Sequence, residues 1–196
     1  MPLPLLVSVK ECLGIYSRMS INAFVAAGCV FMNNTHVLAG YQPNKPNPCI
    51  SGIGGKREGD ETYLDTAIRE MIEEIFGIYN ATSIIEQVKL IEVKMIIIRK
   101  TYIIVLYSFE DLVKIMEIVS KECVDTPIYD SIPLTIEDLI FKRKLCDAEI
   151  SHLVILPVVS HPRDKPFVDG SFLKDLSVII EELSTPSGLS GSFGLP

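Results

Sequence analysis

Residues 55–78, GKREGDETYLDTAIREMIEEIFGI, decide how the rest of the chain is interpreted. The segment begins as a glycine-rich polar loop, and residues 63–76 then have the apolar spacing of a helix. Thr62 can cap this helix, because Asp65 three residues later completes the pattern of a capping box. Gly77 is a typical stop, since glycine adopts the left-handed backbone that ends many helices. The sequence therefore predicts a polar loop that leads into one capped helix.

Three glutamates gather on one face of this predicted helix. Successive helical residues advance by about 100°, so Glu73 and Glu74 lie roughly 60° and 40° to either side of Glu70. The apolar arc is centred roughly 110° away from Glu70. It consists of Leu64, Ala67, Ile68, Met71 and Ile75. Such a carboxylate cluster is either a solvated acidic face or a site for a hard divalent cation, whose protein ligands are oxygens.

The spacing of the segment resembles the Nudix box, G-x5-E-x7-R-E-U-x-E-E-x-G-U, in which U is apolar. The matching positions are Gly55, Glu61, Arg69, Glu70, Met71, Glu73 and Glu74. So many fixed positions make the match far more specific than a lone glycine motif. In one departure, Ile75 and Phe76 separate Glu74 from Gly77, where the family has a single residue. The extra residue lies beyond the glutamates and concerns the end of the helix.

The resemblance implies a role for each box residue. The expected ligands of Mg²⁺, or of Mn²⁺ in its place, are the carboxylates of Glu70, Glu73 and Glu74 and the backbone carbonyl of Gly55. Arg69 and Glu61 would orient these ligands, because a guanidinium holds carboxylates in a fixed fork. The expected catalytic set therefore includes both residues as well as the glutamates.

Three residues outside the ligand set are further candidates for the site. Lys56 and Arg57 lie beside the glycine turn, where they would bind substrate phosphates or be ordinary solvated charges. Many Nudix enzymes use another carboxylate, far along the chain, as base or extra ligand. Glu149 resembles that residue because it precedes a late apolar strand, and the alternative is an ordinary loop glutamate.

The remaining sequence predicts a mixed α/β, or α+β, domain. Strands are expected at 21–32, 36–42, 87–98, 101–109 and 152–159, and helices at 110–122, around 136–144 and at 171–183. The first two strands are expected to form a hairpin through Asn33 and Asn34. With the box, this order is similar to the Nudix fold, a mixed sheet between helices, here with a partly helical insertion around 110–148. Residues 1–183 would form one domain, followed by a disordered tail at 184–196.

Composition excludes several other classes of protein. The net charge of −7 argues against a strongly basic nucleic-acid surface and favours contact with anionic substrates through a cation. The five cysteines are scattered without CxxC spacing, which is typical of reduced thiols in a cytosolic protein. Charged residues interrupt the apolar segment 88–109, and the N-terminus is a poor signal peptide. We therefore expect a cytoplasmic protein that does not span a membrane.

The resemblance implies a Mg²⁺-dependent pyrophosphohydrolase, in which a metal-activated water cleaves the phosphoanhydride of a nucleoside-diphosphate-linked substrate. A first alternative is an mRNA-decapping enzyme that releases m7GDP from capped RNA. The GGKRE loop and the EISHLVIL segment are loosely similar to decapping Nudix enzymes of large DNA viruses. The basic run 142–144 would then contribute to an RNA path. A second alternative is an inactive Nudix-fold binding module. Many relatives are dimers, and nothing in this sequence specifies an interface.

Overall fold

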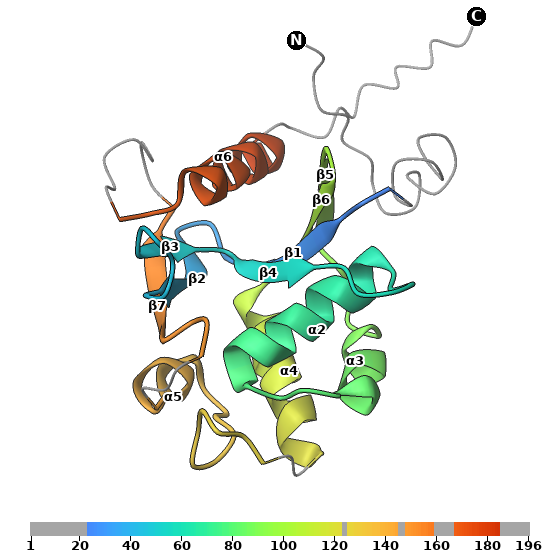
Figure 1. The fold of residues 1–196 in the computed structure, drawn as a ribbon, viewed down its shortest axis with the longest axis vertical. Helices are drawn as coiled ribbons and strands as arrows, with labels where there is room; N and C mark the ends of the chain where they lie inside the picture. Colours follow the sequence, from blue (N-terminus) through green and yellow to red (C-terminus); the bar gives the residue numbers. More distant parts are fainter. Residues whose placement is uncertain (1–22, 123–124, 145–147, 159–166, 185–196) are drawn as a thin grey trace, which may run out of the picture.

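The structure is a computed structural model that describes residues 23–122, 125–144, 148–158 and 167–184 (Figure 1). In chain order its elements are β1 (Ala26–Phe31), β2 (His36–Gln42), β3 (Cys49–Ser51), β4 (Ile53–Lys56), α2 (Tyr63–Phe76), α3 (Thr82–Val88), β5 (Met95–Arg99), β6 (Tyr102–Tyr107), α4 (Phe109–Lys121), α5 (Ile136–Phe141), β7 (His152–Pro157) and α6 (Gly170–Ser184). No helix within the described ranges is both long enough and apolar enough to cross a membrane.

The strands form two sheets, with the orders β4-β1-β6-β5 and β3-β2-β7. In the larger sheet β1 is parallel to β6 and antiparallel to β4, while β5 and β6 form an antiparallel pair. In the smaller sheet β2 is antiparallel to both β3 and β7. The segment 49–56 passes from the smaller sheet to the larger at Gly52, between β3 and β4. The segment that leads into the box therefore takes part in both sheets.

The predicted hairpin of the first two strands is wrong in its pairing. The Asn33 side chain accepts hydrogen bonds from the N–H groups of Thr35 and His36, so the chain does turn there. Beyond the bridge between Met32 and Val37, however, β1 and β2 diverge into different sheets. Both edges of β1 are already paired, with β4 and β6, so no edge is available to β2.

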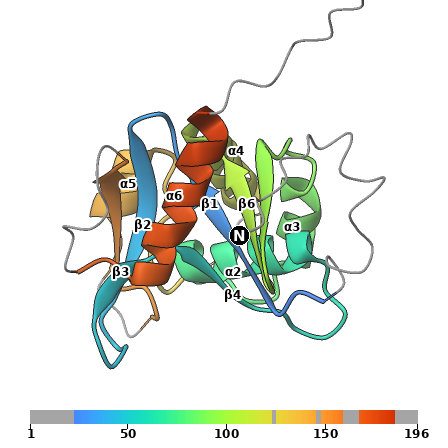
Figure 2. The ribbon, with the colours of Figure 1, turned by 90° about the horizontal axis from the view of Figure 1, so that it is seen from above.

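Helices cover both faces of the larger sheet. Alternate residues of β1 and β6 pack against α2, α3 and α4 on one face, among them Phe31 and Ile103. The intervening residues, such as Val30 and Ile104, pack on the other face with Phe172 and other apolar side chains of α6. Figures 1 and 2 show α2 and α4 on one side and α6 crossing the other side between the two sheets. The predicted layering of mixed strands between helices is confirmed.

The predicted box helix is confirmed at both ends. α2 has the capping box in which the Thr62 hydroxyl accepts from the Asp65 N–H. Gly77 adopts a left-handed backbone with φ of 68°, and its N–H donates to the carbonyl of Glu73 over 2.9 Å. The extra residue before Gly77 is therefore accommodated as part of an ordinary helix end.

Several other boundaries differ from the predictions. The expected strand 87–98 is shortened to β5, because residues 87 and 88 end α3, whose Ile84 and Val88 pack in the core, and residues 89–94 connect the two elements. Ser108 caps α4, which ends β6 at Tyr107. α5 is shorter than the expected helix, and β7 is only partly buried because it is an edge strand. Apart from Ser184, the expected disordered tail lies outside the described residues.

Candidate active site

Arg69 lies at the centre of the box and binds several of its carboxylates. Its Nε donates to Oε1 of Glu61 over 2.7 Å, and its Nη1 donates to Glu70 and Glu73 over 2.9 and 3.2 Å. Its Nη2 donates to the backbone carbonyl of Lys56 over 2.7 Å. One planar group therefore fixes two of the expected metal ligands relative to the loop that faces them.

Glu61 is held in place as a partner of Arg69. Its carboxylate also accepts the backbone N–H of Glu58 over 3.0 Å and the hydroxyl of Thr66 over 2.8 Å. Burial favours a higher pKa for Glu61, but these hydrogen bonds and the guanidinium outweigh it and lower the pKa. An ionised Glu61 keeps Arg69 oriented, which is the positioning role that the box resemblance implies.

Glu74 is buried at the junction of α2 and β4. Its side chain is 8% exposed, and Oε2 accepts the backbone N–H of Gly54 over 2.7 Å. Burial raises the pKa of Glu74 to about 8; the Gly54 hydrogen bond opposes this shift, and the charges of Glu149 and Glu70 add to it. The anionic form of Glu74 is therefore costly in this site unless a cation lies beside it.

Glu70 packs directly onto the glycine loop. A Cβ at Gly55 would overlap the Glu70 carboxylate, so only glycine allows this close approach. Burial raises the pKa of Glu70, Arg69 opposes the rise, and Glu73 and Glu149 reinforce it. Burial likewise raises the pKa of Glu73. Oxygen donors that repel one another in a partly buried site suit a hard divalent cation.

The acidic side chains are not already arranged as a cation site. Within the described ranges, no group of three or more acidic, histidine or cysteine side chains is placed to hold a metal ion. Glu70 and Glu73 are turned toward Arg69, and Glu74 is turned toward the N–H of Gly54. The chemistry of these donors fits Mg²⁺ or Mn²⁺, while the ligand set of Glu70, Glu73, Glu74 and Gly55 remains a prediction.

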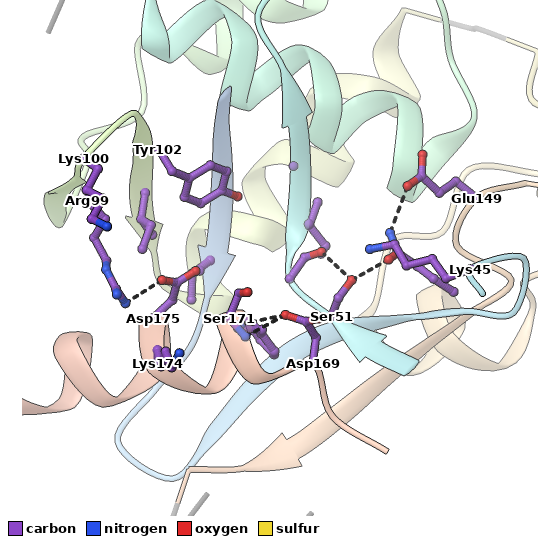
Figure 3. A pocket seen from close by; sticks show the side chains of 17 residues that line it. Lys45, Ser51, Arg99, Lys100, Tyr102, Glu149, Asp169, Ser171, Lys174 and Asp175 are labelled. Atoms are coloured by element: carbon purple, nitrogen blue, oxygen red, sulfur yellow. Dashed lines mark hydrogen bonds and ion pairs between the residues drawn. The ribbon is translucent and has the colours of Figure 1, made fainter. Parts of the chain in front are cut away.

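Glu149 lies beside the box although it is 75 residues beyond Glu74 in the sequence. Its negative charge contributes to the raised pKa of both Glu74 and Glu70. Its Oε1 accepts a hydrogen bond of 3.1 Å from the side-chain amide of Gln42, whose Oε1 accepts from Ser51 over 2.8 Å (Figure 3). The structure thus brings this distant carboxylate close to the box, and its role as base or extra ligand stays a prediction.

A cavity of about 520 Å³ opens beside the box (Figure 3). Its walls come from β4, from the β5–β6 pair and from α6, and its lining includes Gly54, whose N–H holds Glu74. The charged lining residues are Lys45, Arg99, Lys100, Lys174, Glu149, Asp169 and Asp175. Its size falls in the ordinary range for small-ligand pockets. The α2 glutamates are not part of this lining, and the cavity meets the box through Gly54 and Glu149.

Sequence reasoning missed most of the lining residues. Gln42 was visible as a polar residue ending an apolar strand, and it is 3% exposed. The Tyr102 hydroxyl lies against Gly28 of β1 and Gly54 of β4. A Cβ at either glycine would crowd it. Burial raises the pKa of Tyr102, so its hydroxyl stays protonated as a hydrogen-bond donor at the cavity wall.

Lys56 and Arg57 do not line the cavity. Lys56 is exposed, and the Arg57 guanidinium lies 4.8 Å from the ring centroid of Phe24 in a cation–π contact. Their predicted contact with substrate phosphates stays a prediction. The cations that do line the cavity come from other parts of the chain.

The prediction that the basic run 142–144 contributes to an RNA path is wrong, because its central residue is buried. Arg143 is 9% exposed and donates to the carbonyls of Glu74, Ile75 and Ile150. Its neighbour Lys142 forms an ion pair with Asp138, four residues earlier on α5. A buried arginine at the centre of the run cannot contribute to a nucleic-acid path.

A family model, the NUDIX domain, matches residues 23–126, which is more than half of the chain and includes the box. No curated protein matches the sequence. Similar solved structures include a NUDIX family hydrolase from Clostridium perfringens, with 14% identity, a TM-score of 0.40 and coverage of 83% of this chain and 99% of that one.

Another is a bifunctional NMN adenylyltransferase/ADP ribose pyrophosphatase from Francisella tularensis, complexed with AMP and a manganese ion. It has 17% identity and a TM-score of 0.44, and the alignment covers 81% of this chain and 41% of that one. The chain thus spans about two fifths of the length of the bifunctional protein. On the match to the family model, the chain belongs to the Nudix family of hydrolases, and its mixed strands between helices form the Nudix fold.

Proposed function

We propose that the chain is a Mg²⁺- or Mn²⁺-dependent pyrophosphohydrolase that cleaves the phosphoanhydride bond of a nucleoside-diphosphate-linked substrate. One observation carries this proposal: the carboxylates of Glu70, Glu74 and Glu149 interact electrostatically beside a cavity of about 520 Å³. An acidic protein can accept a diphosphate at such a place only with cations between the two sets of negative charge. The family supports the same reaction class.

In this proposal Glu70, Glu73 and Glu74 hold the cation, with the carbonyl of Gly55. The bound cation would neutralise phosphate charge and lower the pKa of a water molecule. Arg69 keeps the first two carboxylates in position through its Nη1. Glu74 is held from the opposite side by the N–H of Gly54. The chain thus presents its donors from α2 and from β4.

Glu149 is the proposed general base. Its Oε1 accepts the Gln42 amide, which leaves Oε2 as the oxygen that would take a proton from the attacking water. Ser51 donates to the Oε1 of Gln42, and this fixes the amide with its nitrogen toward Glu149. The order of the three side chains therefore determines which carboxylate oxygen faces the substrate.

A substrate screen tests the proposal. Purified chain is incubated with dNTPs, ADP-ribose, dinucleoside polyphosphates, diphosphoinositol phosphates and capped RNA, each with Mg²⁺, with Mn²⁺ and with EDTA. Cation-dependent release of a nucleotide supports the proposal, and release of m7GDP from capped RNA would identify a decapping enzyme. Turnover that persists in EDTA contradicts the metal requirement. A lack of turnover with every substrate would favour a binding module.

A further inference from the structure

The end of the cavity farther from Glu149 is lined by cations (Figure 3). Arg99 and Lys100 come from the tight connection between β5 and β6, and Lys174 comes from the second turn of α6. Elements far apart in the sequence thus place three positive side chains around one opening, in a protein whose net charge is −7. An anion is the ligand that such a group favours.

The acidic residues at this end are already bound to other groups. Asp175 forms an ion pair of 2.7 Å with Arg99. Asp169 accepts the N–H groups of Ser171 and Phe172 at the start of α6, over 2.8 and 3.1 Å. By contrast, Lys100 and Lys174 form no ion pair with any residue in the described ranges. Three cations against two carboxylates leave this end of the cavity with one net positive charge.

Tyr102 lines the cavity beside the end that carries Arg99 and Lys100 (Figure 3). Burial is the main cause of its raised pKa, and the charges of Asp175 on one side and of Glu74 and Glu70 on the other add to it. The phenol therefore lies within electrostatic reach of both ends. A substrate whose diphosphate lies at the carboxylates of α2 and whose body passes Tyr102 would reach Lys100 and Lys174 with its far end.

We propose that Lys100 and Lys174 form an anion subsite for a second phosphate group, carried by the substrate on the part remote from the scissile diphosphate. This inference rests on the proposed function, because the proposed reaction fixes where the diphosphate lies. The substrate class is then a nucleotide derivative with a further phosphate on its sugar. That phosphate is either a monoester or the next phosphodiester of an oligonucleotide, since both present the same oxygens to an ammonium group.

Binding of matched nucleotides isolates the second phosphate. Calorimetric titrations compare AMP, adenosine 3′,5′-bisphosphate and the dinucleotide pApA against the wild-type chain. The bisphosphate should bind about tenfold more tightly than AMP, in keeping with charge-assisted hydrogen bonds. An equal advantage for pApA identifies a phosphodiester as an acceptable ligand, and an advantage for the bisphosphate alone identifies a monoester. Equal affinity for AMP and the bisphosphate, or no binding of the bisphosphate, overturns the proposal.

The variant Lys100→Asn/Lys174→Ala assigns the effect to this end of the cavity. Asparagine is chosen at position 100 because the backbone there has φ of 55°, which asparagine tolerates. The variant should lose most of the bisphosphate advantage while its affinity for AMP changes less than about twofold. The control Lys121→Ala/Lys142→Ala removes the same charge from the last residue of α4 and the C-cap of α5, neither of which lines the cavity, and should keep the advantage.

The outcomes separate this inference from the proposed function. An equal loss in both double variants indicates a general charge effect and overturns the subsite, and Lys174→Ala alone provides a second measurement if the double variant folds poorly. If the chain hydrolyses a nucleotide substrate with a cation but binds the bisphosphate no more tightly than AMP, the subsite is overturned and the proposed function stands. If the chain binds the bisphosphate more tightly than AMP but hydrolyses no substrate, the proposed reaction is overturned and the anion-binding subsite stands.

Discussion

The carboxylate of Glu74 and the backbone N–H of Gly54 are joined by a hydrogen bond of 2.7 Å that links the box helix to β4. Because Gly54 also lines the cavity, this bond places a buried carboxylate immediately behind the cavity wall. Its neighbour Gly55 has no room for a side chain beside Glu70. Consecutive glycines thus bring the backbone of β4 against two glutamates of α2.

Replacing Glu74→Gln should abolish most turnover and leave the fold intact. The amide oxygen can still accept the Gly54 N–H, while the substitution removes a buried charge whose desolvation is unfavourable. We expect an activity loss greater than the roughly 10- to 100-fold typical of residues that only orient metal ligands. Activity is measured with Mg²⁺, and stability by thermal unfolding. Near-normal turnover in this variant would contradict the ligand assignment.

Arg69→Lys should weaken activation by the cation. A lysine ammonium cannot reproduce the fork that binds Glu61, Glu70 and Glu73 together. The Mg²⁺ concentration for half-maximal activity should rise by roughly 10- to 100-fold, the range for lost orienting contacts. The matched substitution Arg99→Lys changes an arginine that pairs only with Asp175 among the described carboxylates, and its Mg²⁺ dependence should stay unchanged. Equal Mg²⁺ curves for both variants would argue against an orienting role for Arg69.

Glu149→Gln should lower kcat by roughly 10²- to 10⁴-fold, the usual contribution of a general base. The loss should appear in kcat rather than in KM. Gln42→Leu removes the hydrogen bond to Glu149 and should give a smaller kcat effect in the same direction. A variant at position 149 that retains a near wild-type kcat would exclude Glu149 as the base.

Two tyrosines of β6 provide a matched pair at opposite faces of the sheet. Tyr102→Phe should weaken nucleotide binding by roughly 3- to 10-fold, corresponding to one lost hydrogen bond. Tyr107→Phe should leave binding unchanged and stability the same or higher, because its buried hydroxyl has no hydrogen-bond partner among the described atoms. Equilibrium dialysis with AMP and thermal unfolding test both variants. Equal binding by the two variants would remove Tyr102 from the substrate contacts.

Asp111 should make stability dependent on acidic pH. It is 1% exposed at the start of α4, and although burial favours a higher pKa, Lys114, Ser108 and Lys94 lower the pKa to about 2. The stabilisation is present above the unfolded pKa of 3.8 and is lost as pH falls from there toward 2, since the unfolded chain binds the proton first.

Between pH 5 and pH 2, the unfolding free energy of the wild-type chain should therefore fall by about 2 kcal/mol more than that of Asp111→Asn. The change is measured by urea unfolding at several pH values. The exposed neighbour Glu110, whose pKa is lowered by hydrogen bonds at the start of α4, provides the comparison, and Glu110→Gln should change the curve less than Asp111→Asn does. A wild-type pH dependence in Asp111→Asn would show that other carboxylates are responsible.

Local sequence predicted the parts of the site that lie close together in the chain. Helical spacing alone grouped the three glutamates of α2, and the capping pattern fixed both ends of the helix. The resemblance to the family box added the partnership of Arg69 with Glu61, which the observed hydrogen bonds support. These features depend on separations of a few residues, where chain geometry leaves little freedom.

The remainder of the site depends on strand pairing that sequence spacing does not encode. Gln42 reaches Glu149 because β2 pairs with β7 in a defined register, with Tyr41 opposite His152. Tyr102 reaches the glycines because β6 lies parallel to β1, with Ala26 opposite Tyr102. The wrong prediction of a hairpin has the same cause. β1 pairs with β4 and β6, and β2 pairs with β3 and β7, although a turn joins β1 to β2.

Arg143 has a consequence for the smallest fragment of the chain that could carry the proposed site. Its guanidinium binds the last carbonyls of the helix that bears the box and the carbonyl of Ile150, next to Glu149. These hydrogen bonds join the C-terminal end of α2 to the segment that bears Glu149, and so hold the two parts of the proposed site together. The match to the family model ends at residue 126, before both Arg143 and Glu149. A fragment trimmed to that boundary would retain the proposed cation ligands. It would lose the proposed base, Glu149, and also Arg143, which ties the segment of Glu149 to α2.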